Sequence, residues 1–532
     1  MDGKRPTISS MNGIVAAAHP HAAAAGARIL AQGGTAFDAA VATAAALNVV
    51  EPFMSSLAGQ GLATCWIAKE KRVRTLNFVP RIPLKFPIDR LSQRAQLARG
   101  PVSVGVPGNL AGWAELMRAH GRMGFAETLA PAIALARSGF PVTGFTIYET
   151  NTTAPEIAAF PDLWGPWAQT YTDGSGRLAP GFVLKQAALA DTLEAIAVHG
   201  AGHLYGGALG RALVAHLAAT GGCIDMADLD AVKPQWSDPA TARYRDIVVN
   251  VPPPPCEGFQ FLMALRILDG FDLGSLERNG VEHIDTVWRA IRLSAGERIA
   301  NNNPSPDRLA ELLSPAHIDR LRARVKDGAP ITGPTEQWMA PQPDRREHHT
   351  TSFSVADREG NVVCVTQSIG SPYGAAVIVP GTGLVLNNFL YWADVQPGSP
   401  NRSKPGGELP MCVSPSLSLR NGAPVLALGT PGSYGIKQTQ TQALVQYIDF
   451  GQSIQDAIEA PRGRLWDGRV VTAESRIAPD VREALARRGH EIEVGDAYTM
   501  KVGGMQGIAI DQVTGAMTGG CDPRRDGYVV PA

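Results

Sequence analysis

The sequence of 532 residues predicts an α+β fold, and three patterns along the chain support this prediction. Two helical segments separated by a glycine pair lie near the N-terminus. Apolar residues then recur with helical spacing through much of residues 100–300, which predicts a layer of helices. After Thr350 the apolar residues alternate with their neighbours, which is typical of strands.

The helices are predicted in chain order. Over residues 22–50 we expect a helix, a break at Gly33-Gly34, the N-cap residue Thr35 and a second helix. Five later segments have helical spacing: Ala111–His120, Ala126–Ser138, Gln186–His199, Gly207–Thr220 and Gly258–Leu268. Between the last two, residues 247–251 predict a strand, and the prolines of 252–255 predict a rigid connection after it.

The second part of the chain begins after a segment rich in charge and proline, residues 307–343, which predicts an exposed linker. Apolar residues then alternate on both sides of the polar run 357–361, which predicts a β-hairpin. Further on, a strand at 425–428 and a helix at 436–450 are predicted on either side of Gly432 and Ser433.

Composition excludes several partners. A formal net charge of −1 gives no electrostatic basis for binding nucleic acid or an anionic membrane surface. The first residues lack the apolar run of a signal peptide, so we expect a cytoplasmic protein. Residues 36–50 are apolar but too short to cross a membrane.

The sequence predicts no metal and no cofactor. Six cysteines are scattered without a Cys-x-x-Cys pair or neighbouring histidine ligands, so neither a zinc site nor a disulfide framework is expected. No P-loop, Gly-x-Ser-x-Gly or His-Glu-x-x-His motif is present.

Thr350 and Thr351, at the start of the predicted hairpin, are the strongest candidates for catalysis. A threonine hydroxyl is a poor nucleophile, but at a chain's first position its own α-amine accepts the hydroxyl proton. Such a role for Thr350 requires a cut between His349 and Thr350. The alternative is that the two threonines merely begin a strand, where β-branched residues are common.

The stretch from Thr350 resembles the processing site of the γ-glutamyltranspeptidase family, with its pattern Thr-Thr-x-x-Ser-Val-x-Asp-x-x-Gly-Asn. The resemblance continues in family order from residue 11 to the end, through these segments: Ser103–Gly108, Tyr205–Gly207, Leu386–Asn388, Ser414–Ser416, Gly429–Gly432, Ala460–Arg462 and Asp522–Arg525. It implies an Ntn-hydrolase fold, an αββα four-layer sandwich formed by both halves of the precursor. Residues 1–349 would then be the large subunit and residues 350–532 the small subunit of a heterodimer.

The resemblance also implies the supporting catalytic residues. Ser368 occupies the place of a family threonine whose hydroxyl supports the nucleophile. Gly432 and Ser433 stand where the family has a Gly-Gly oxyanion hole, and a strand-to-helix turn presents backbone N–H groups suited to that task. His349 lies on the leaving side of the cut, so we interpret it as a linker residue.

The binding residues depart from the family pattern. The family binds the substrate's α-amine with acidic side chains just after Asn-Asn, where this chain has Phe389 and Trp392. It binds the α-carboxylate with an early arginine and a Ser-Ser pair, where this chain has Val79 and Met411-Cys412. An unpartnered charge in a dry site costs about a few kcal/mol, so γ-glutamyl compounds are expected to be poor substrates.

Two further binding predictions follow. Arg81 lies two residues from the missing arginine and is a candidate for a smaller acid, although an arginine near a surface turn is commonly just solvated. Phe389, Tyr391 and Trp392 are candidates for an apolar wall of the acyl pocket, or for simple packing.

These features predict an autoprocessed amidohydrolase that forms an acyl-enzyme on Thr350 and cleaves a small or partly apolar amide. The divergent binding residues resemble the oxamate amidohydrolase or acylase side of the family. Two alternatives stay open: a true γ-glutamyltransferase with a repositioned pocket, and an uncleaved, inactive binding paralogue. Subunit bands on a denaturing gel separate the last from an enzyme.

Overall fold

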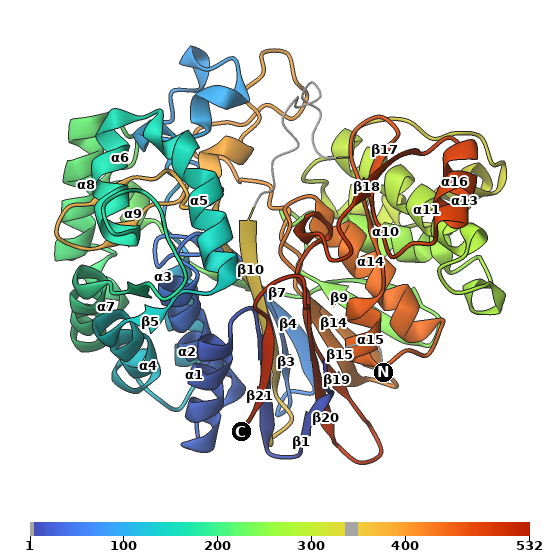
Figure 1. The fold of residues 1–532 in the computed structure, drawn as a ribbon, viewed down its shortest axis with the longest axis horizontal. Helices are drawn as coiled ribbons and strands as arrows, with labels where there is room; N and C mark the ends of the chain where they lie inside the picture. The colour runs from blue at the N-terminus through green and yellow to red at the C-terminus, as the bar shows by residue number, and fades with distance from the viewer. Residues whose placement is uncertain (1–4, 336–348) are drawn as a thin grey trace.

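Two seven-stranded antiparallel sheets form the centre of the computed structural model, which describes residues 5–335 and 349–532 (Figure 1). The first sheet has the order β21 (Tyr528–Pro531), β2 (Gly13–Ala17), β10 (His349–Asp357), β11 (Val362–Gly370), β3 (Gln60–Ile67), β4 (Arg72–Asn77) and β7 (Gln235–Ser237). The second has the order β1 (Ile8–Ser10), β20 (Met517–Cys521), β19 (Gln506–Ile510), β15 (Ala423–Gly429), β14 (Ser416–Arg420), β9 (Ile247–Val251) and β8 (Ala240–Tyr244).

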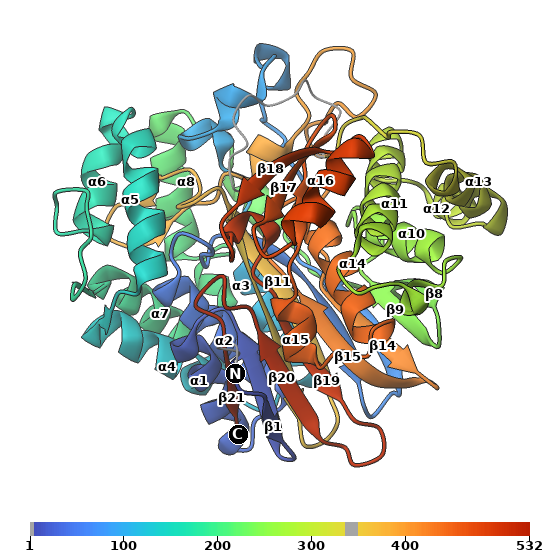
Figure 2. The same ribbon diagram turned by 45° about the vertical axis from the view of Figure 1, so that its right-hand side comes forward.

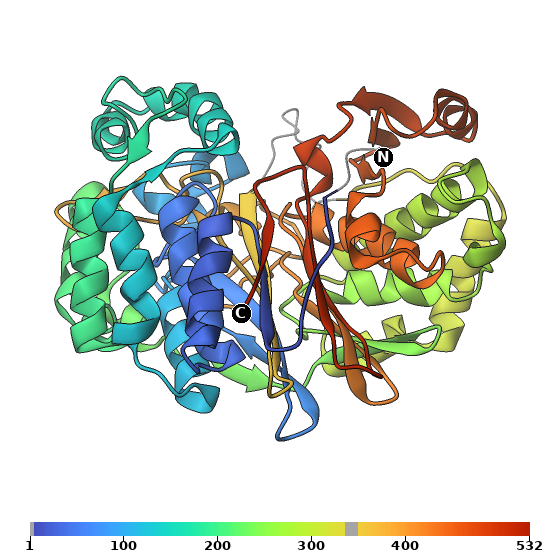
Figure 3. The same cartoon turned by 60° about the horizontal axis from the view of Figure 1, so that its bottom comes forward.

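Helices cover the outer faces of both sheets (Figures 1 and 3). On the side of the first sheet lie α1 (Pro20–Ala31), α2 (Ala36–Val50), α3 (Asn109–His120), α4 (Phe125–Ser138), α5 (Gly144–Ala158), α6 (Pro161–Tyr171), α7 (Ala187–His199), α8 (Ala208–Thr220) and α9 (Met226–Asp230). On the side of the second lie α10 (Phe259–Leu268), α11 (Val281–Ala300), α12 (Pro306–Leu312), α13 (Pro315–Lys326), α14 (Gly435–Ile448), α15 (Ile454–Glu459) and α16 (Pro479–Arg487). Figure 2 shows α14 and α15 crossing the outer face of β15, β19 and β20.

Three small sheets lie outside the two central ones. They are β5 (Phe140–Pro141) with β6 (Val183–Leu184), β12 (Ile378–Val379) with β13 (Leu384–Val385), and β16 (Gly463–Leu465) with β17 (Val470–Glu474) and β18 (Glu491–Gly495). Among the described residues, no helix is long and apolar enough to span a membrane.

The predicted α+β, four-layer αββα arrangement is confirmed. The inner faces of the sheets pack on each other through Ile14, Cys364, Leu417, Ala427 and Ile508. Residues before and after position 350 supply strands to both sheets, so the two sequence ranges form one interwoven body. The first sheet interleaves β2, β3, β4 and β7 with β10, β11 and β21, so neither range could form it alone.

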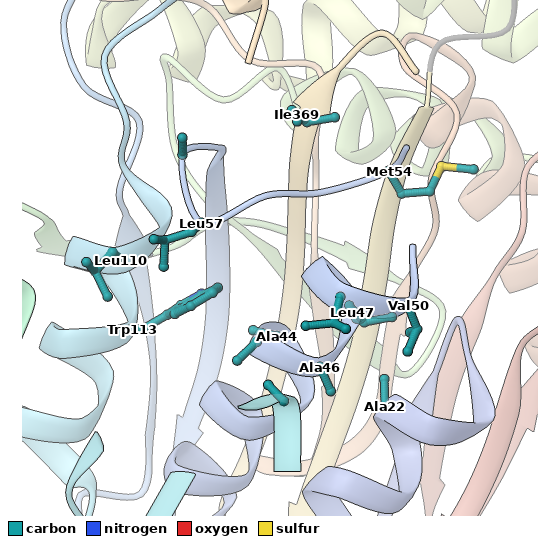
Figure 4. Packing of buried hydrophobic residues seen from close by; sticks show 14 of the residues in the cluster. Ala22, Ala44, Ala46, Leu47, Val50, Met54, Leu57, Leu110, Trp113 and Ile369 are labelled. Atoms are coloured by element: carbon teal, nitrogen blue, oxygen red, sulfur yellow. The ribbon is translucent and has the colours of Figure 1, made fainter. Parts of the chain in front are cut away.

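Helix α2 shows how the sequence builds the layer behind the first sheet. Thr35 accepts from the N–H of Asp38, and Asp38 accepts from the N–H of Thr35, so the predicted N-cap is a complete capping box. All fifteen residues of the helix are buried. Its alanines let neighbouring elements approach closely, as Figure 4 shows around Ala44 and Ala46.

The hairpin predicted after Thr350 is present as β10 and β11. Asp357 closes its turn by accepting from the backbone N–H groups of Glu359 and Asn361, both at 2.9 Å. The register shifts between His349 and Thr351, so Thr350 lies at an irregularity where β10 begins. Such irregularities re-aim a side chain at the end of a strand.

The prediction of an exposed linker from 307 to 343 was wrong for its first part. Residues 306–312 and 315–326 form α12 and α13 instead. Ser305 and Ser314 cap these helices, and a proline occupies the first turn of each. Ile318, Leu321 and Val325 are buried in the core beside α10 and α11. Residues 336–343 lie outside the described part of the chain.

Candidate functional site

Thr350 and Ser368 form the centre of the candidate site. Thr350 is the second residue of β10 and is 4% exposed. Its hydroxyl donates to Oγ of Ser368 on β11 over 3.2 Å, and the same Oγ accepts from the N–H of Gly370 at 3.0 Å. The two sequence-predicted residues are therefore in direct contact. His349 takes part in the β10 ladder through its backbone, opposite Gly370.

Strand β10 meets the last residue of β15 two residues after Thr350. Ser352, two residues further along β10, shares a face with Thr350 because side chains in a strand alternate. A Cβ built on Gly429, the last residue of β15, would lie 2.0 Å from Oγ of Ser352. We therefore expect Thr350 to lie on the side of the turn that follows β15, which holds Gly432 and Ser433.

That turn connects β15 to α14, as predicted. Gly432 and Ser433 both have positive φ angles, 125° and 51°. The φ of Ser433 lies in the left-handed region, which is strained for a serine, so glycine would suit position 433 better. The carbonyls of these residues accept from the N–H groups of Gly435 and Ile436, while their own N–H groups donate to no other described residue. Two free donors at a helix start suit a developing oxyanion.

An aromatic cluster lies beside the turn, and we define it as Phe389, Trp392, Met411, Cys412 and Tyr434. All five residues are buried in one apolar group. Sγ of Cys412 lies 3.8 Å from Oγ of Ser433. The structure thus brings together four of the five predicted binding residues, all but Arg81, and adds Tyr434, which follows Ser433 in sequence.

Trp392 connects the aromatic cluster to the Thr350–Ser368 pair. A Cβ at Gly370 would lie 3.1 Å from Cζ3 of Trp392 and 2.1 Å from Oδ1 of Asn388. A larger residue at position 370 would therefore clash with these side chains, and the φ of 100° at this position also requires glycine. Because Gly370 also donates to Ser368, the Trp392 ring lies close to the Thr350–Ser368 pair.

The pair Asn387-Asn388 positions the short helix η6 (Phe389–Trp392). The side chain of Asn387 accepts from the N–H groups of Gly105 and Phe389 and donates to the carbonyls of Ala58 and Gly105. Asn388 accepts from the N–H of Ser371 at 2.8 Å. These amides fix the wall of the aromatic cluster.

A buried charge network supports the other side of the cluster. Glu257 contacts Nη1 of Arg298 at 3.1 Å and Nζ of Lys437 at 3.2 Å, and all three side chains are at most 3% exposed. Burial opposes ionisation of Glu257, but Arg298 and Lys437 outweigh it and lower the pKa of the carboxyl. Lys437 also donates to the carbonyl of Cys412, and both cations lie over the Tyr434 ring. Two cations thus face one carboxylate here.

Arg81 lies at the surface, where Nη1 donates to the carbonyl of Gly406 at 3.2 Å. It lines a cavity of about 360 Å³ together with Val79, Asp228 and Lys233. Val79 and Leu409 belong both to this cavity and to the apolar group around the aromatic cluster. The role of Arg81 in binding an acid stays a prediction.

Sequence reasoning missed Glu51, Arg94, Glu257 and Tyr434. Tyr434 had a local signal, because it follows the predicted oxyanion turn directly. The others come from a helix end, a short 3-10 turn and a loop, where no spacing pattern marks a site. Within residues 5–335 and 349–532, no group of three potential metal ligands is found, and all six cysteines are free and buried.

Comparisons with known proteins match this architecture. A family model described as gamma-glutamyltranspeptidase matches residues 22–532. The acylase ACY 1 proenzyme of Pseudomonas sp. (strain SE83) is 35% identical over 544 residues, covering 99% of this chain and 94% of that protein. The glutathione hydrolase-like YwrD proenzyme of Bacillus subtilis (strain 168) is 30% identical, covering 97% of this chain and 98% of that protein.

Among solved structures, the cephalosporin acylase from Bacillus halodurans superimposes with a TM-score of 0.90 at 30% identity. The match covers 100% of this chain and 98% of that one. Since the family model and these relatives span nearly the whole chain, the protein belongs to the γ-glutamyltranspeptidase family of Ntn hydrolases and is a hydrolytic enzyme acting on amide C–N bonds.

Proposed function

We propose that this protein is an autoprocessed N-terminal-threonine amidohydrolase of the acylase type, which removes a small, partly apolar acyl group from an amide. The observation that carries the proposal is the contact between Thr350 and Ser368 beside the aromatic cluster. The similarity to relatives named acylase proenzyme supports both the processing and the reaction class.

Processing would begin when Oγ of Thr350 attacks the carbonyl carbon of His349. The acyl group moves from nitrogen to oxygen, and water then hydrolyses the resulting ester. This releases the His349 carboxylate and leaves a free α-amine on Thr350, with a reference pKa of about 8. That amine is the base for the second reaction, because it accepts the hydroxyl proton of its own residue.

In the second reaction, Oγ of Thr350 attacks the amide carbon of the substrate. The N–H groups of Gly432 and Ser433 stabilise the tetrahedral oxyanion, the leaving amine takes a proton, and an acyl ester remains on Thr350. Water attacks the ester and regenerates the threonine. Ser368 holds the hydroxyl in the orientation required for both attacks.

The aromatic cluster argues for an acyl group without an α-ammonium. Phe389 and Trp392 are 3% and 5% exposed and offer no carboxylate to such a charge.

The second candidate function is that of a γ-glutamyltransferase. It has support from relatives named glutathione hydrolase, such as that of Bacillus subtilis at 29% identity.

One comparison of substrates tests the proposal. Purified protein should hydrolyse neutral or carboxylate-bearing acyl p-nitroanilides with a higher kcat/KM than γ-glutamyl-p-nitroanilide. Equal or greater efficiency on the γ-glutamyl compound would favour the second candidate. An unsplit chain without turnover on either substrate would overturn both.

A further inference from the structure

A cavity of about 440 Å³ lies at the start of α7, in the helical layer beside the first sheet. Its walls come from α6, α7, α8 and the hairpin of β12 and β13. The residues that line it include neither the Thr350–Ser368 pair, nor the turn at Gly432-Ser433, nor any member of the aromatic cluster. The volume is that of a small-molecule site, so this cavity is a candidate for a second ligand.

The N-terminus of α7 forms one wall of the cavity. The first N–H groups of an α-helix have no partner within the helix. Gln186 is the N-cap residue of α7, but its side chain makes no capping hydrogen bond. The N–H groups of Ala187, Ala188 and Leu189 all lie on this wall and donate to no other residue in the described part of the chain. Such donors suit an anion.

Gln186 adds an acceptor without a partner at the same place. The residue is 4% exposed, and its Nε2 donates to the carbonyl of Val49 in α2 at 2.7 Å. Its Oε1 is buried, and no residue that the structure describes donates to it. A buried amide oxygen without a donor costs about 1–3 kcal/mol. A ligand that carries a donor close to its anionic group would satisfy this oxygen.

Gly383 keeps the start of α7 open to the cavity. A Cβ on Gly383 would lie 2.5 Å from the backbone nitrogen of Leu189, and both residues line the cavity. The hairpin that carries Gly383 is fixed against α7, because the hydroxyl of Thr192 donates to the carbonyl of Thr382 at 2.8 Å. Any side chain at position 383 would therefore cover the N–H of Leu189.

The walls carry charges of both signs beside an apolar surface. Lys185 directly precedes Gln186, and Asp162 lies in the first turn of α6. Lys185 can donate to an anion, whereas Asp162 can accept from a cation. The apolar part of the wall consists of Leu163, Pro166, Val377, Ile378, Val379 and Pro380. This combination matches a zwitterionic head with an apolar side chain.

We propose that the cavity at the start of α7 is a binding site for an apolar α-amino acid, separate from the candidate active site. The carboxylate accepts from the N–H groups of residues 187–189 and from Lys185. The ammonium donates to Oε1 of Gln186 and to Asp162, and the side chain packs on the apolar wall. The two head groups of an α-amino acid share one carbon, which matches donors and an acceptor that belong to consecutive residues.

Calorimetry on the full-length protein tests this site with three ligands. L-Leucine carries both head groups, leucinamide lacks the carboxylate, and 4-methylpentanoate lacks the ammonium. L-Leucine is expected to bind with a Kd of about 1 mM or lower. Each analogue should bind at least ~10-fold more weakly, because it leaves either the helix donors or Gln186 unsatisfied. No binding of L-leucine, or equal binding of 4-methylpentanoate, overturns the inference.

Two variants locate the binding. Lys185→Gln should weaken L-leucine binding about 3- to 10-fold, since the lost charge is exposed and partly screened. Gly383→Ala should weaken it at least ~10-fold by covering the N–H of Leu189. Lys69→Gln, which removes an exposed lysine between β3 and β4, is the matched control and should bind as the wild type does.

Thermal unfolding checks that Gly383→Ala is folded. If it is not, Lys185→Gln decides alone. L-Leucine binding that is as tight in Lys185→Gln as in Lys69→Gln would place the amino acid elsewhere, including the candidate active site, and would overturn the inference. The outcome does not depend on the reaction at Thr350, because binding is measured without a substrate.

Discussion

The hydroxyl of Thr351 donates a 2.9 Å hydrogen bond to Oε2 of Glu51, which ends helix α2. The two residues are 300 positions apart in sequence, yet they fix the strand on the face opposite Thr350. The second carboxyl oxygen of Glu51 is buried and has no partner. Burial raises the pKa of Glu51 to about 8, with Thr351 and Arg525 opposing the rise and Asp526 adding to it.

Glu51 should make the protein less stable as the pH rises. From its ordinary pKa of 4.5 up to about 8, the folded protein retains a proton that the unfolded chain has released. Stability therefore decreases with pH across this window, and the cost is absent below it. Glu51→Gln removes the titrating group and with it this cost. The free energy of unfolding of the variant, minus that of the wild type, should therefore increase by about a few kcal/mol between pH 5 and 8.5.

Denaturant unfolding of both proteins at the two pH values measures this margin. Glu70→Gln, at an exposed ion pair with Arg72, is the control and should show little pH-dependent difference. A margin that is constant with pH would contradict a raised pKa for Glu51.

Thr350→Ala should abolish both chain cleavage and amide hydrolysis, because one hydroxyl serves both steps. A denaturing gel should show one band for the variant and two for the wild type, with the smaller wild-type band beginning at Thr350. Thr351→Ala is the control: it removes the neighbouring hydroxyl and the bond to Glu51 but retains the nucleophile. Cleavage in Thr350→Ala at the same position would disprove the assignment.

Ser368→Ala should lower kcat by roughly 10- to 100-fold, since it removes the group that orients Thr350 and one buried hydrogen bond of ~1–3 kcal/mol. Ser352→Ala removes a comparable buried hydroxyl, which donates to the carbonyl of Val365, and should affect stability more than kcat. Steady-state kinetics and thermal unfolding of both variants separate these effects. Similar kcat values for the two would argue against a role for Ser368.

Ser433→Gly should retain kcat within a few-fold, because the N–H donor belongs to the backbone. Its φ of 51° favours glycine, so this variant should also be more stable than Ser433→Ala by about 1 kcal/mol. Comparing kcat and melting temperature for both variants checks this. A large loss of kcat in the glycine variant would instead give the serine side chain a role in the reaction. Ser433→Pro should lower kcat strongly, since proline removes the backbone N–H donor and cannot adopt a positive φ.

Phe389→Glu combined with Trp392→Asp should raise the kcat/KM of γ-glutamyl-p-nitroanilide relative to neutral-acyl substrates, because the acids provide partners for the α-ammonium. The shift should be incomplete, since Val79, Met411 and Cys412 still offer no carboxylate site. Loss of two buried aromatic residues should also destabilise the protein by several kcal/mol, on the order of 3–5 for each. An unchanged substrate ratio in a folded variant would rule out this view of the pocket.

Local patterns in the sequence determined much of the fold and the centre of the site. The hairpin after Thr350, the capping box at Thr35 and the turn at Gly432-Ser433 depend on neighbouring residues, so each was predictable. The helices α12 and α13 were also encoded locally, by the pairs Ser305-Pro306 and Ser314-Pro315, but their charged composition led to the wrong prediction of a linker.

Only the tertiary structure decided which distant residues share the site. Arg94 reaches Tyr391 across 297 positions, and Glu257 reaches Lys437 across 180. Spacing within a segment determines the face of a helix or strand, but pairing of strands from both halves of the chain determines what that face meets. The sequence therefore predicted Thr350 as the candidate nucleophile and located the turn at Gly432-Ser433, whereas the buried contacts of Arg94 and Glu51 became visible only once the two sheets were assembled.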